Sequence, residues 1–385
     1  MKNPQLILNN ADLVSVCNEM SKETFVTVDT EFVRERTYWP ILCLVQLGGT
    51  HNAYAVDPLA KDLDLSPLFE LMSNPKITKV FHAAKQDLEI FLKLMGKLPA
   101  PLADTQVMAM ISGHGEQVGY ESLVQRIAKQ SIDKSNRYTD WSKRPLTNAQ
   151  LTYAIADVTH LRLIYETLLQ EAREKGRESW IEELMADLNK PETYVIEPEN
   201  AWKRLKPRVD KPKFLGVLTH LAAWRETEAQ RRDRIRNHII RDEAINEIAA
   251  TQPRTKGELA RIRGLGENNA KGSLGTKILE VVEAGLASAD TNPMSLPKRP
   301  KNDNTSNFVV DLLKVLLKAR CDENKVASKL VATSADIDQF IRGDENSIIL
   351  KGWRYEIFGR EAQQLLNGSL SLGVNKGALE IHNKD

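Results

Sequence analysis

The sequence predicts an α/β domain with a mixed β-sheet, followed by two all-helical domains. Residues 5–110 alternate short β-branched or aromatic runs with segments of helical periodicity, which is typical of α/β layering. Strand patterns fade after Asp104, and residues 146–172 carry one long helical pattern. The chain has 385 residues, whereas one hydrophobic core seldom grows beyond about 250–300 residues, so two or three domains are expected.

Each element of the first domain is predicted from its own pattern. Five apolar runs predict strands at Leu6–Leu8, Phe25–Phe32, Leu42–Leu47, Ala53–Val56 and Lys79–His82. Apolar residues at helical spacing predict helices at Ala11–Met20, Leu65–Met72, Asp87–Leu94 and Leu146–Ala172. The predicted bounds are 1–190 for the α/β domain, 191–213 for a basic linker, 214–289 for the first helical domain, 290–304 for a second linker and 305–385 for the second helical domain.

The region after residue 190 contains a proline-rich basic stretch and a repeated pattern. Residues 198–213 hold six basic and two acidic residues, which is typical of a linker or a short ordered connector with a basic surface. Thr255-Lys-Gly-Glu258 has the form of a helix capping box. Two motifs recur, Ile262-Arg-Gly264 as Ile341-Arg-Gly343 and Ala249-Ala-Thr251 as Val331-Ala-Thr333. We therefore predict a diverged tandem repeat of helical domains.

Composition excludes several classes of protein. The chain is 42% hydrophobic and 27% charged, as is usual for a globular protein, and no apolar stretch of about 18 residues or signal-like N-terminus predicts a membrane span or secretion. The formal net charge of +1 gives no overall excess for binding polyanions, so a nucleic-acid role must rest on local basic patches and on metal ions. Cys17, Cys43 and Cys321 are widely spaced and odd in number, which argues against a zinc site and predicts a reducing, cytoplasmic setting.

Five residues suit hydrolysis of a phosphodiester. Period-two alternation places Asp29 and Glu31 on one face of a strand, and a spacing of four residues places Tyr153 and Asp157 on one face of a helix. With Asp87 they offer four carboxylates and no His or Cys ligands, a donor set that Mg²⁺ or Mn²⁺ prefers. We expect Asp29 to bridge two ions, Glu31 and Asp157 to hold the one next to the nucleophile, Asp87 to help hold the other, and Tyr153 to orient the attacking water.

Each of these residues also has a structural interpretation. An Asp-x-Glu pair is more often a solvated strand face, and Asp87 is placed to cap or charge the first turn of a helix. Tyr153 and Asp157 suit an exposed helix surface equally well. Taken singly, the structural interpretation is favoured at each position, and the catalytic one rests on all five occurring together.

The motifs around these residues resemble a known family. Val28-Asp-Thr-Glu-Phe32, Tyr38–Leu47, Val80–Leu88, Asp140–Leu146 and Tyr153–Val158 resemble the three exonuclease motifs of the DEDD superfamily, in its tyrosine-bearing branch and within it the bacterial ribonuclease D family. The helical domains resemble the HRDC module, although the second lacks counterparts of Pro253 and of the turn at Gly264–Gly266. The resemblance implies a ribonuclease H-like fold, two metal ions and 3′→5′ removal of nucleotides. It also matches the four acids to metal ligands and Tyr153 to the residue that positions water.

Other residues are weaker candidates for substrate contact. His82 lies at a strand end before the helix of Asp87, where a structural role is more often found than a substrate contact. Gln46 lies on a strand predicted to neighbour that of Asp29, where a buried core amide and a substrate contact are equally expected. Basic residues interleave with Tyr138 and Trp141 in the segment that ends at Arg144, a pattern that suits either phosphate contact with base stacking or a packed, solvated loop.

The sequence thus predicts a cytoplasmic, metal-dependent 3′→5′ exoribonuclease. The family resemblance points to 3′ maturation of precursor tRNA, with helical domains that help bind structured RNA and without a membrane or an obligate protein partner. A DNA exonuclease of repair or proofreading type is the nearest alternative, because contacts to the 2′-hydroxyl are not visible in sequence. The second alternative is a catalytically inactive scaffold that binds nucleic acid. The retention of mutually repelling acids argues against this alternative.

Overall fold

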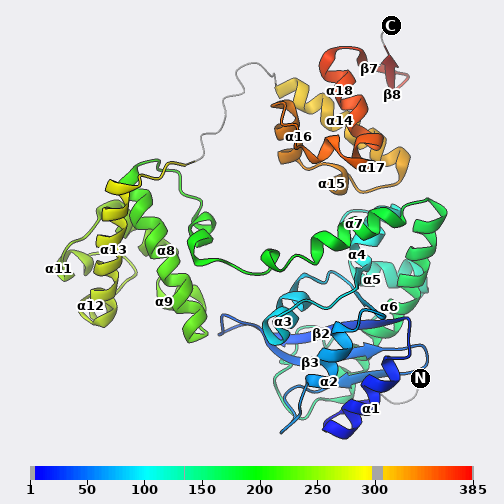
Figure 1. Cartoon of the computed structure of the whole chain (residues 1–385), viewed down its shortest axis with the longest axis horizontal. Coiled ribbons are helices and arrows are strands. Elements are labelled where there is room, and N and C mark those ends of the chain that lie inside the picture. The colour runs from blue at the N-terminus through cyan, green and yellow to red at the C-terminus, as the bar shows by residue number, and fades with distance from the viewer. Residues whose placement is uncertain (1–4, 134, 297–306, 384–385) are drawn as a thin grey trace. The chain divides into compact units, whose positions relative to one another are not determined.

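A computed structural model describes residues 5–133, 135–296 and 307–383, and these form two compact units (Figure 1). The first unit comprises Met1–Glu31, Cys43–Lys190 and Pro300–Asp385, and the second comprises Phe32–Leu42 and Pro191–Arg299. No helix among the described residues is long and apolar enough to span a bilayer.

The first unit is built on a six-stranded mixed sheet in the order β1-β4-β3-β2-β5-β6. Its strands are β1 (Gln5–Ile7), β2 (Phe25–Val33), β3 (Ile41–Gly48), β4 (Ala53–Val56), β5 (Thr78–Phe81) and β6 (Leu102–Asp104). β1 is parallel to β4, β5 is parallel to β2 and β6, and β3 is antiparallel to β4. The predicted mixed sheet is confirmed. Only β6 was missed, because Leu102-Ala-Asp104 contains no β-branched or aromatic residue.

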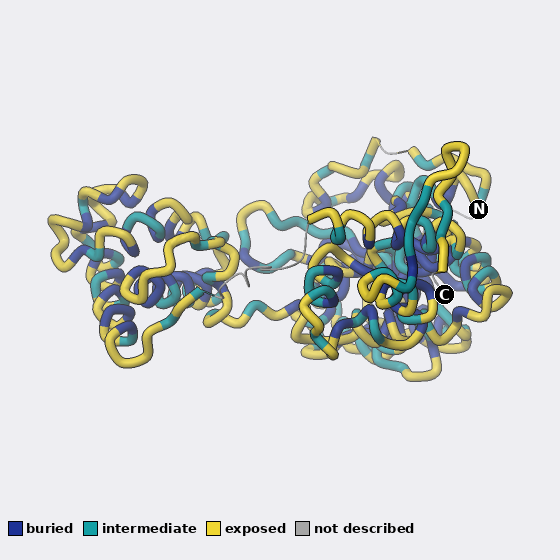
Figure 2. The backbone as a smooth tube through the Cα atoms, turned by 90° about the horizontal axis from the view of Figure 1, so that it is seen from above, coloured by how far each residue is buried: buried dark blue, intermediate teal, exposed yellow. Residues whose placement is uncertain are grey.

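Helices cover this sheet, and α6 lies directly on it. The helical segments are α1 (Asn10–Met20), α2 (Ser66–Ser73), α3 (Lys85–Met95), α4 (Thr105–Ser112), α5 (Tyr120–Leu123), η1 (Val124–Ala128), α6 (Asn148–Glu174) and α7 (Glu178–Leu188). The Thr27 hydroxyl lies 2.7 Å from the carbonyl oxygen of Val158 in α6 and 3.2 Å from that of Gly48 in β3. A Cβ on Gly48 would lie 2.3 Å from the Thr27 hydroxyl, so glycine permits this close approach. β3 is buried over all but its first residue, and buried residues are dark blue in Figure 2.

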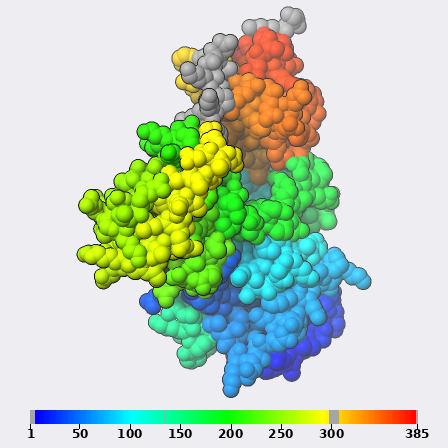
Figure 3. All heavy atoms as spheres, turned by 60° about the vertical axis from the view of Figure 1, so that its left-hand side comes forward, coloured from blue at the N-terminus to red at the C-terminus, as the bar shows by residue number. Residues whose placement is uncertain are grey.

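The C-terminal helical region packs against α4 and α7 of the same unit. Its elements are α14 (Asn307–Asn324), α15 (Ser328–Val331), α16 (Ser334–Ile341), η4 (Ile348–Leu350), α17 (Gly352–Arg354), η5 (Tyr355–Gly359) and α18 (Arg360–Asn367). The Ala327 amide donates to the Met110 carbonyl at 2.9 Å, and the Trp180 and Trp353 rings stack at 4.3 Å. Arg177 donates to carbonyl oxygens on both sides of the contact. Figure 3 shows this region, in orange and red, against the green of α7.

A β-hairpin follows α18, although the sequence predicted only helices there. β7 (Leu370–Asn375) pairs antiparallel with β8 (Ala378–Asn383). The turn between them is Lys376-Gly377, and both residues have positive φ, at 49° and 84°. Such a turn matches the twist of two adjoining strands, and glycine adopts it without strain. The hairpin was missed because each of its strands contains a single β-branched residue and no Phe, Trp or Tyr.

The second unit contains a helical bundle. Its elements are η2 (Pro191–Thr193), η3 (Pro198–Leu205), α8 (Pro212–Arg232), α9 (Arg236–Ile239), α10 (Asp242–Thr251), α11 (Lys256–Leu259), α12 (Glu267–Lys271) and α13 (Ser273–Thr291). α8 and α13 cross at two glycines, where a Cβ on Gly216 would lie 2.3 Å from the Gly285 carbonyl oxygen. Leu205 packs on the bundle core, so the basic stretch before α8 is an ordered connector. Most of the second predicted linker lies outside the described residues.

Helix caps correct one detail of the predicted repeat. Thr255 accepts a hydrogen bond from the Glu258 amide, but the Glu258 carboxylate accepts from Arg254, so the predicted capping box is only half formed. Thr333 forms a complete capping box at the start of α16. Thr333 therefore corresponds in role to Thr255, whereas Thr251, its predicted counterpart, is the last residue of α10.

Tyr38 joins residues 32–42 to the bundle of the second unit. Its side chain is buried, and its hydroxyl donates to Glu226 and accepts from Arg236 at 2.9 Å and from Gln230 at 3.2 Å. Arg236 also forms a two-point ion pair with Glu226, with both distances 2.6 Å. Burial and the bond to Glu226 raise the pKa of Tyr38 to about 12, so the hydroxyl remains a donor at neutral pH. The amide of Trp39 adds a bond of 2.9 Å to Asp233.

We predict that Glu226→Ala lowers the free energy of unfolding by about 3–5 kcal/mol, because Arg236 loses its buried partner. Tyr38→Phe should lower it by about 1–2 kcal/mol through the lost hydroxyl. Urea unfolding of the full chain measures both changes. Lys277→Ala is the matched control, since the Lys277–Glu280 pair is exposed and should contribute less than about 1 kcal/mol. A Glu226→Ala midpoint equal to that of the control would contradict the prediction.

Candidate active site

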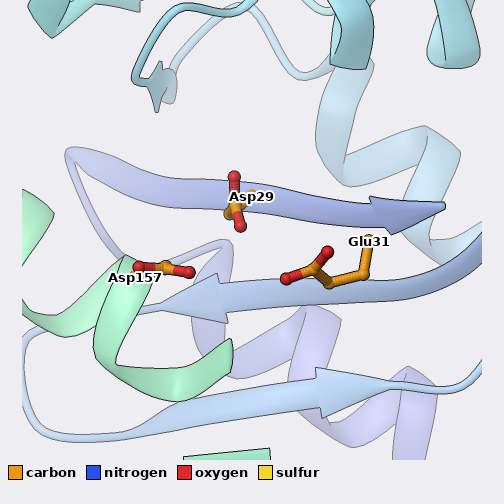
Figure 4. A group of neighbouring side chains, drawn as sticks. All are labelled: Asp29, Glu31 and Asp157. Carbon is orange, nitrogen blue, oxygen red and sulfur yellow. The ribbon is translucent and has the colours of Figure 1, made fainter. Parts of the chain in front are cut away.

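Strand β2 carries the first two acids of the site. Its residues alternate between the faces of the sheet, so Thr27, Asp29 and Glu31 share the face covered by α6. Asp29 and Glu31 keep limited solvent access. The carboxylates of Asp29, Glu31 and Asp157 each place one oxygen within 4.8 Å of the others, and Figure 4 shows the three side chains converging from strand and helix.

Helix α6 supplies the other two residues. Thr147 and Gln150 form a complete capping box that begins the helix at Asn148. From there Tyr153 and Asp157 lie one turn apart on the same face. The Tyr153 hydroxyl lowers the pKa of Asp157, and burial keeps the pKa of Tyr153 itself above its usual value.

Asp87 lies in the first turn of α3 but does not cap it, so the capping interpretation is wrong, whereas an acid in this turn still suits the helix dipole. Its buried carboxylate accepts a hydrogen bond from the Thr30 hydroxyl. The turn into α3 is held instead by Asp104, which accepts from the Ala83 and Ala84 amides, both at 2.9 Å. Asp104 therefore helps fix the position of Asp87, a role that the sequence did not reveal.

The four acids disfavour one another's charge. Burial, and after it the Asp157 carboxylate, raise the pKa of Asp29 well above its usual value. Burial and the three neighbouring acids raise the pKa of Glu31 to about 10. Burial raises the pKa of Asp157 to about 7, although Tyr153 and Arg137 act in the opposite direction, and burial with Asp29 also raises that of Asp87. Arg137 lowers the pKa values of Glu31 and Asp157, but burial outweighs it at both residues, as expected of a site that binds a cation.

The donor set fits divalent metal ions. It contains carboxylate oxygens only, which hard ions such as Mg²⁺ and Mn²⁺ prefer to sulfur or imidazole. Asp29, Glu31 and Asp157 are the one group of three or more potential metal ligands found in the part of the chain that the structure describes. Asp87 adjoins Asp29 as a fourth acid.

Arg144, predicted as a substrate contact, has a structural role. It binds the buried Asp57 carboxylate through Nε and Nη2, both at 2.6 Å. Its other donors go to the carbonyl oxygens of Trp141 and Lys143 through Nη1 and of Cys43 through Nη2. A guanidinium has five N–H groups, and all five are used, so none remains for a phosphate.

Trp141 and Gln46 are also too deeply buried to contact a substrate directly. Trp141 is 3% exposed, with its ring 6.2 Å from that of Tyr153, so it supports the tyrosine and has no free face for a base. Gln46 is fully buried on β3, two residues before Gly48 and hence on the face under α6. No hydrogen bond to its side-chain amide is formed within the described residues.

His82 and Tyr138 differ from these two residues. The His82 Nδ1 lies 2.9 Å from the Thr105 hydroxyl, and its ring packs 5.5 Å from that of Tyr120, a structural environment. Tyr138 is 89% exposed and available for contact. Sequence reasoning missed Tyr120, whose hydroxyl donates at 3.0 Å to the carbonyl of Ala156, next to Asp157.

Comparison with known proteins agrees with this geometry. A family model described as 3′-5′ exonuclease matches residues 4–173, and one for the HRDC domain matches residues 214–282. Ribonuclease D of Granulibacter bethesdensis is 46% identical over 98% of this chain and 96% of its own length. Ribonuclease D of Gluconacetobacter diazotrophicus is 48% identical over 97% of this chain and 95% of its own.

A solved structure extends the similarity to the whole fold. The crystal structure of Escherichia coli RNase D, described as an exoribonuclease involved in structured RNA processing, matches with a TM-score of 0.83 and 30% identity. The match covers 95% of this chain and 99% of that one. The chain therefore belongs to the ribonuclease D family of 3′→5′ exoribonucleases.

Proposed function

We propose that this exoribonuclease hydrolyses RNA with two divalent ions, Mg²⁺ or Mn²⁺, and releases 5′-mononucleotides. The observation that carries the proposal is the convergence of three carboxylates within 4.8 Å. In the proposed site, Asp29, Glu31 and Asp157 would hold the ions, with Asp87 helping at Asp29. When bound, two such ions about 3.5–4 Å apart neutralise the phosphate, activate a water and stabilise the leaving oxygen.

The chain's own residues position the reactants. The pKa of Tyr153 is raised by burial and by the neighbouring acids, so its hydroxyl stays protonated at neutral pH. A protonated hydroxyl acts as an orienting donor and acceptor for the attacking water and not as a base. Tyr153 lies one helical turn from Asp157, and the Trp141 ring packs with its centre 6.2 Å from that of Tyr153.

We further propose that the RNA is a structured precursor with a single-stranded 3′ end, such as precursor tRNA, processed in the cytoplasm. Precursor tRNA comes from the family resemblance, and the HRDC domain is the proposed second contact with it. The cytoplasmic setting is supported by three buried free cysteines, Cys17, Cys43 and Cys321.

Matched oligonucleotides test the proposal. RNA and DNA of the same sequence, labelled at the 3′ or the 5′ end, are incubated with Mg²⁺, with Mn²⁺ or with chelator. We expect the 3′ label to appear first as a mononucleotide from RNA, and no release with chelator. A precursor tRNA with a 3′ extension should be shortened to the base of its acceptor stem. Preferential cleavage of DNA would support the alternative of a DNA exonuclease.

Asp157→Asn should nearly abolish hydrolysis while the fold is retained, because it removes a ligand charge without changing size. The same change should raise the melting temperature of the metal-free protein, since it relieves repulsion among the acids. Activity assays and thermal unfolding in chelator measure the two effects. Asp187→Asn is the matched control, because Asp187 is an exposed partner of Lys190. Near wild-type turnover of Asp157→Asn at saturating metal contradicts the proposed ligand set.

Tyr153→Phe should lower kcat by roughly 10²–10⁴-fold, the range for a lost orienting or acid–base group. Metal affinity should change little, because the tyrosine is proposed to bind water and not metal. Single-turnover kinetics and calorimetric Mg²⁺ titration provide the two measurements. If Mg²⁺ binding weakens as much as in Asp157→Asn, the role given to Tyr153 is wrong.

Mg²⁺ affinity should rise between pH 6 and pH 8, because the ion binds ionised carboxylates and the pKa of Asp157 is about 7. A carboxyl group can have a higher pKa in the folded protein than in the unfolded one. Such a group destabilises the folded, metal-free protein as the pH rises from the unfolded-state pKa to the folded-state pKa. The stabilisation by Mg²⁺ should therefore be greater at pH 8 than at pH 6. Calorimetry in two buffers of different ionisation enthalpy counts the released protons. A pH-independent affinity with no proton release contradicts the prediction.

A further inference from the structure

Residues 136–144 form a loop between η1 and α6 that is anchored at several points. Gln150 donates to the Thr139 hydroxyl at 3.1 Å, which in turn donates to the Asn136 carbonyl at 2.9 Å. Arg144 holds the other end through its pairing with Asp57. Trp141 is buried in between. The loop is thus fixed beside the start of α6, the helix that carries Tyr153 and Asp157.

Two adjacent side chains of this loop remain exposed. Tyr138 is 89% exposed, the highest value among the exposed large hydrophobic side chains described, and the Arg137 guanidinium carbon lies 5.3 Å from the centre of its ring. Arg137 also lies within electrostatic reach of the acids, because its charge lowers the pKa values of Glu31 and Asp157. The same loop packs on the proposed site through Trp141, whose ring lies 6.2 Å from that of Tyr153. An exposed aromatic ring and a cation therefore lie side by side on a loop that contacts the proposed active site.

We propose, building on the hydrolysis of RNA proposed above, that Arg137 and Tyr138 form a subsite for the single-stranded 3′ end of the RNA. In this subsite Tyr138 stacks on a base and Arg137 binds a phosphate of the same strand. Stacking on an aromatic ring is tolerant of base identity, which suits an enzyme that removes successive nucleotides of any sequence.

Electrostatics favour Arg137 over the other cations of the loop. An RNA phosphate must approach four acids, so a nearby cation lowers the cost of that approach. The donors of Arg144 are all used within the protein, and Lys143 lies beside Asp140 with its side chain 80% exposed. Among the described basic residues of this loop, Arg137 is the one whose charge lowers the pKa values of both Glu31 and Asp157. Its contact with Tyr138 holds the guanidinium near the ring before RNA binds.

Salt dependence tests the phosphate contact. Binding of a short, unstructured oligoribonucleotide in the presence of Mg²⁺ is measured on the full chain in an Asp29→Asn background, which prevents cleavage. Arg137→Gln should reduce the slope of log K against log salt by about 0.7, the value for one phosphate of a single strand. Lys143→Gln, in the same loop, should leave the slope unchanged. Equal slopes for both variants and for the background protein overturn the role of Arg137.

Abasic substitution tests the stacking contact. Tyr138→Ala should weaken RNA binding about 5–100-fold, as expected for a lost base–aromatic stack. Tyr138→Phe should bind RNA with an affinity close to that of the background protein. Abasic nucleotides are then placed one at a time along the RNA from its 3′ end. At one position the losses of binding free energy caused by the abasic nucleotide and by Tyr138→Ala should not add, because both changes remove the same contact. Additive losses at every position overturn the role of Tyr138.

Failure of the subsite proposal can be distinguished from failure of the proposed function. In the otherwise wild-type protein, Arg137→Gln and Tyr138→Ala should raise KM for single-stranded RNA more than they lower kcat, because the metal ligands are intact. If wild-type protein releases nucleotides in Mg²⁺ but both variants match Lys143→Gln in KM, the subsite is wrong and the hydrolysis stands. If wild-type protein releases no nucleotides, the proposed function fails, and the subsite that rests on it fails as well.

Discussion

Four carboxylates must be held close together although they repel one another, and much of the first unit can be understood from this constraint. Thr30 donates to Asp87, and Tyr153 lies one helical turn from Asp157 and lowers its pKa, so neutral hydroxyl groups accompany two of the acids. Asp104 fixes the turn before Asp87 from its own position at the end of β6. The acids are therefore positioned by neutral donors and by backbone geometry. Neutral donors hold the cluster without cancelling the negative charge that a metal ion requires.

Close packing of α6 on the sheet brings the two halves of the site together. Thr27 bonds to both β3 and α6, and Gly48 leaves the room for that contact. The capping box at Thr147 determines where the helix begins and hence which turn carries Asp157. A shift of α6 by one residue would rotate Tyr153 and Asp157 by about 100° away from β2, because a helix has 3.6 residues per turn. The position of the helix start thus matters as much as the identity of the acids.

Local pattern was sufficient for most of the sheet and for the acidic residues. β2, β3 and β4 were predicted because their apolar alternation lies within a few neighbouring residues, and Asp29 and Glu31 share a face for the same reason. β6 and the β7–β8 hairpin were missed, since they contain few of the β-branched and aromatic residues that favour strands. The segment before α8 was predicted as a linker or an ordered connector, and the sequence left the two open because Leu205 is ordered by packing on distant residues.

The sequence by itself determined which residues are able to do the chemistry, namely four acids and a tyrosine, because strand and helix periodicity are local properties. Only the tertiary structure decided which basic and aromatic residues face the site. Arg144 and Trp141 matched the pattern of an RNA-binding loop, yet the fold uses one to bind Asp57 and the other to support Tyr153. Tyr38 likewise lies in the segment after Glu31 but packs with Glu226 and Arg236. The reason is physical: burial and hydrogen-bond partners are set by residues about 90 to 190 positions away, and local patterns contain no information about them.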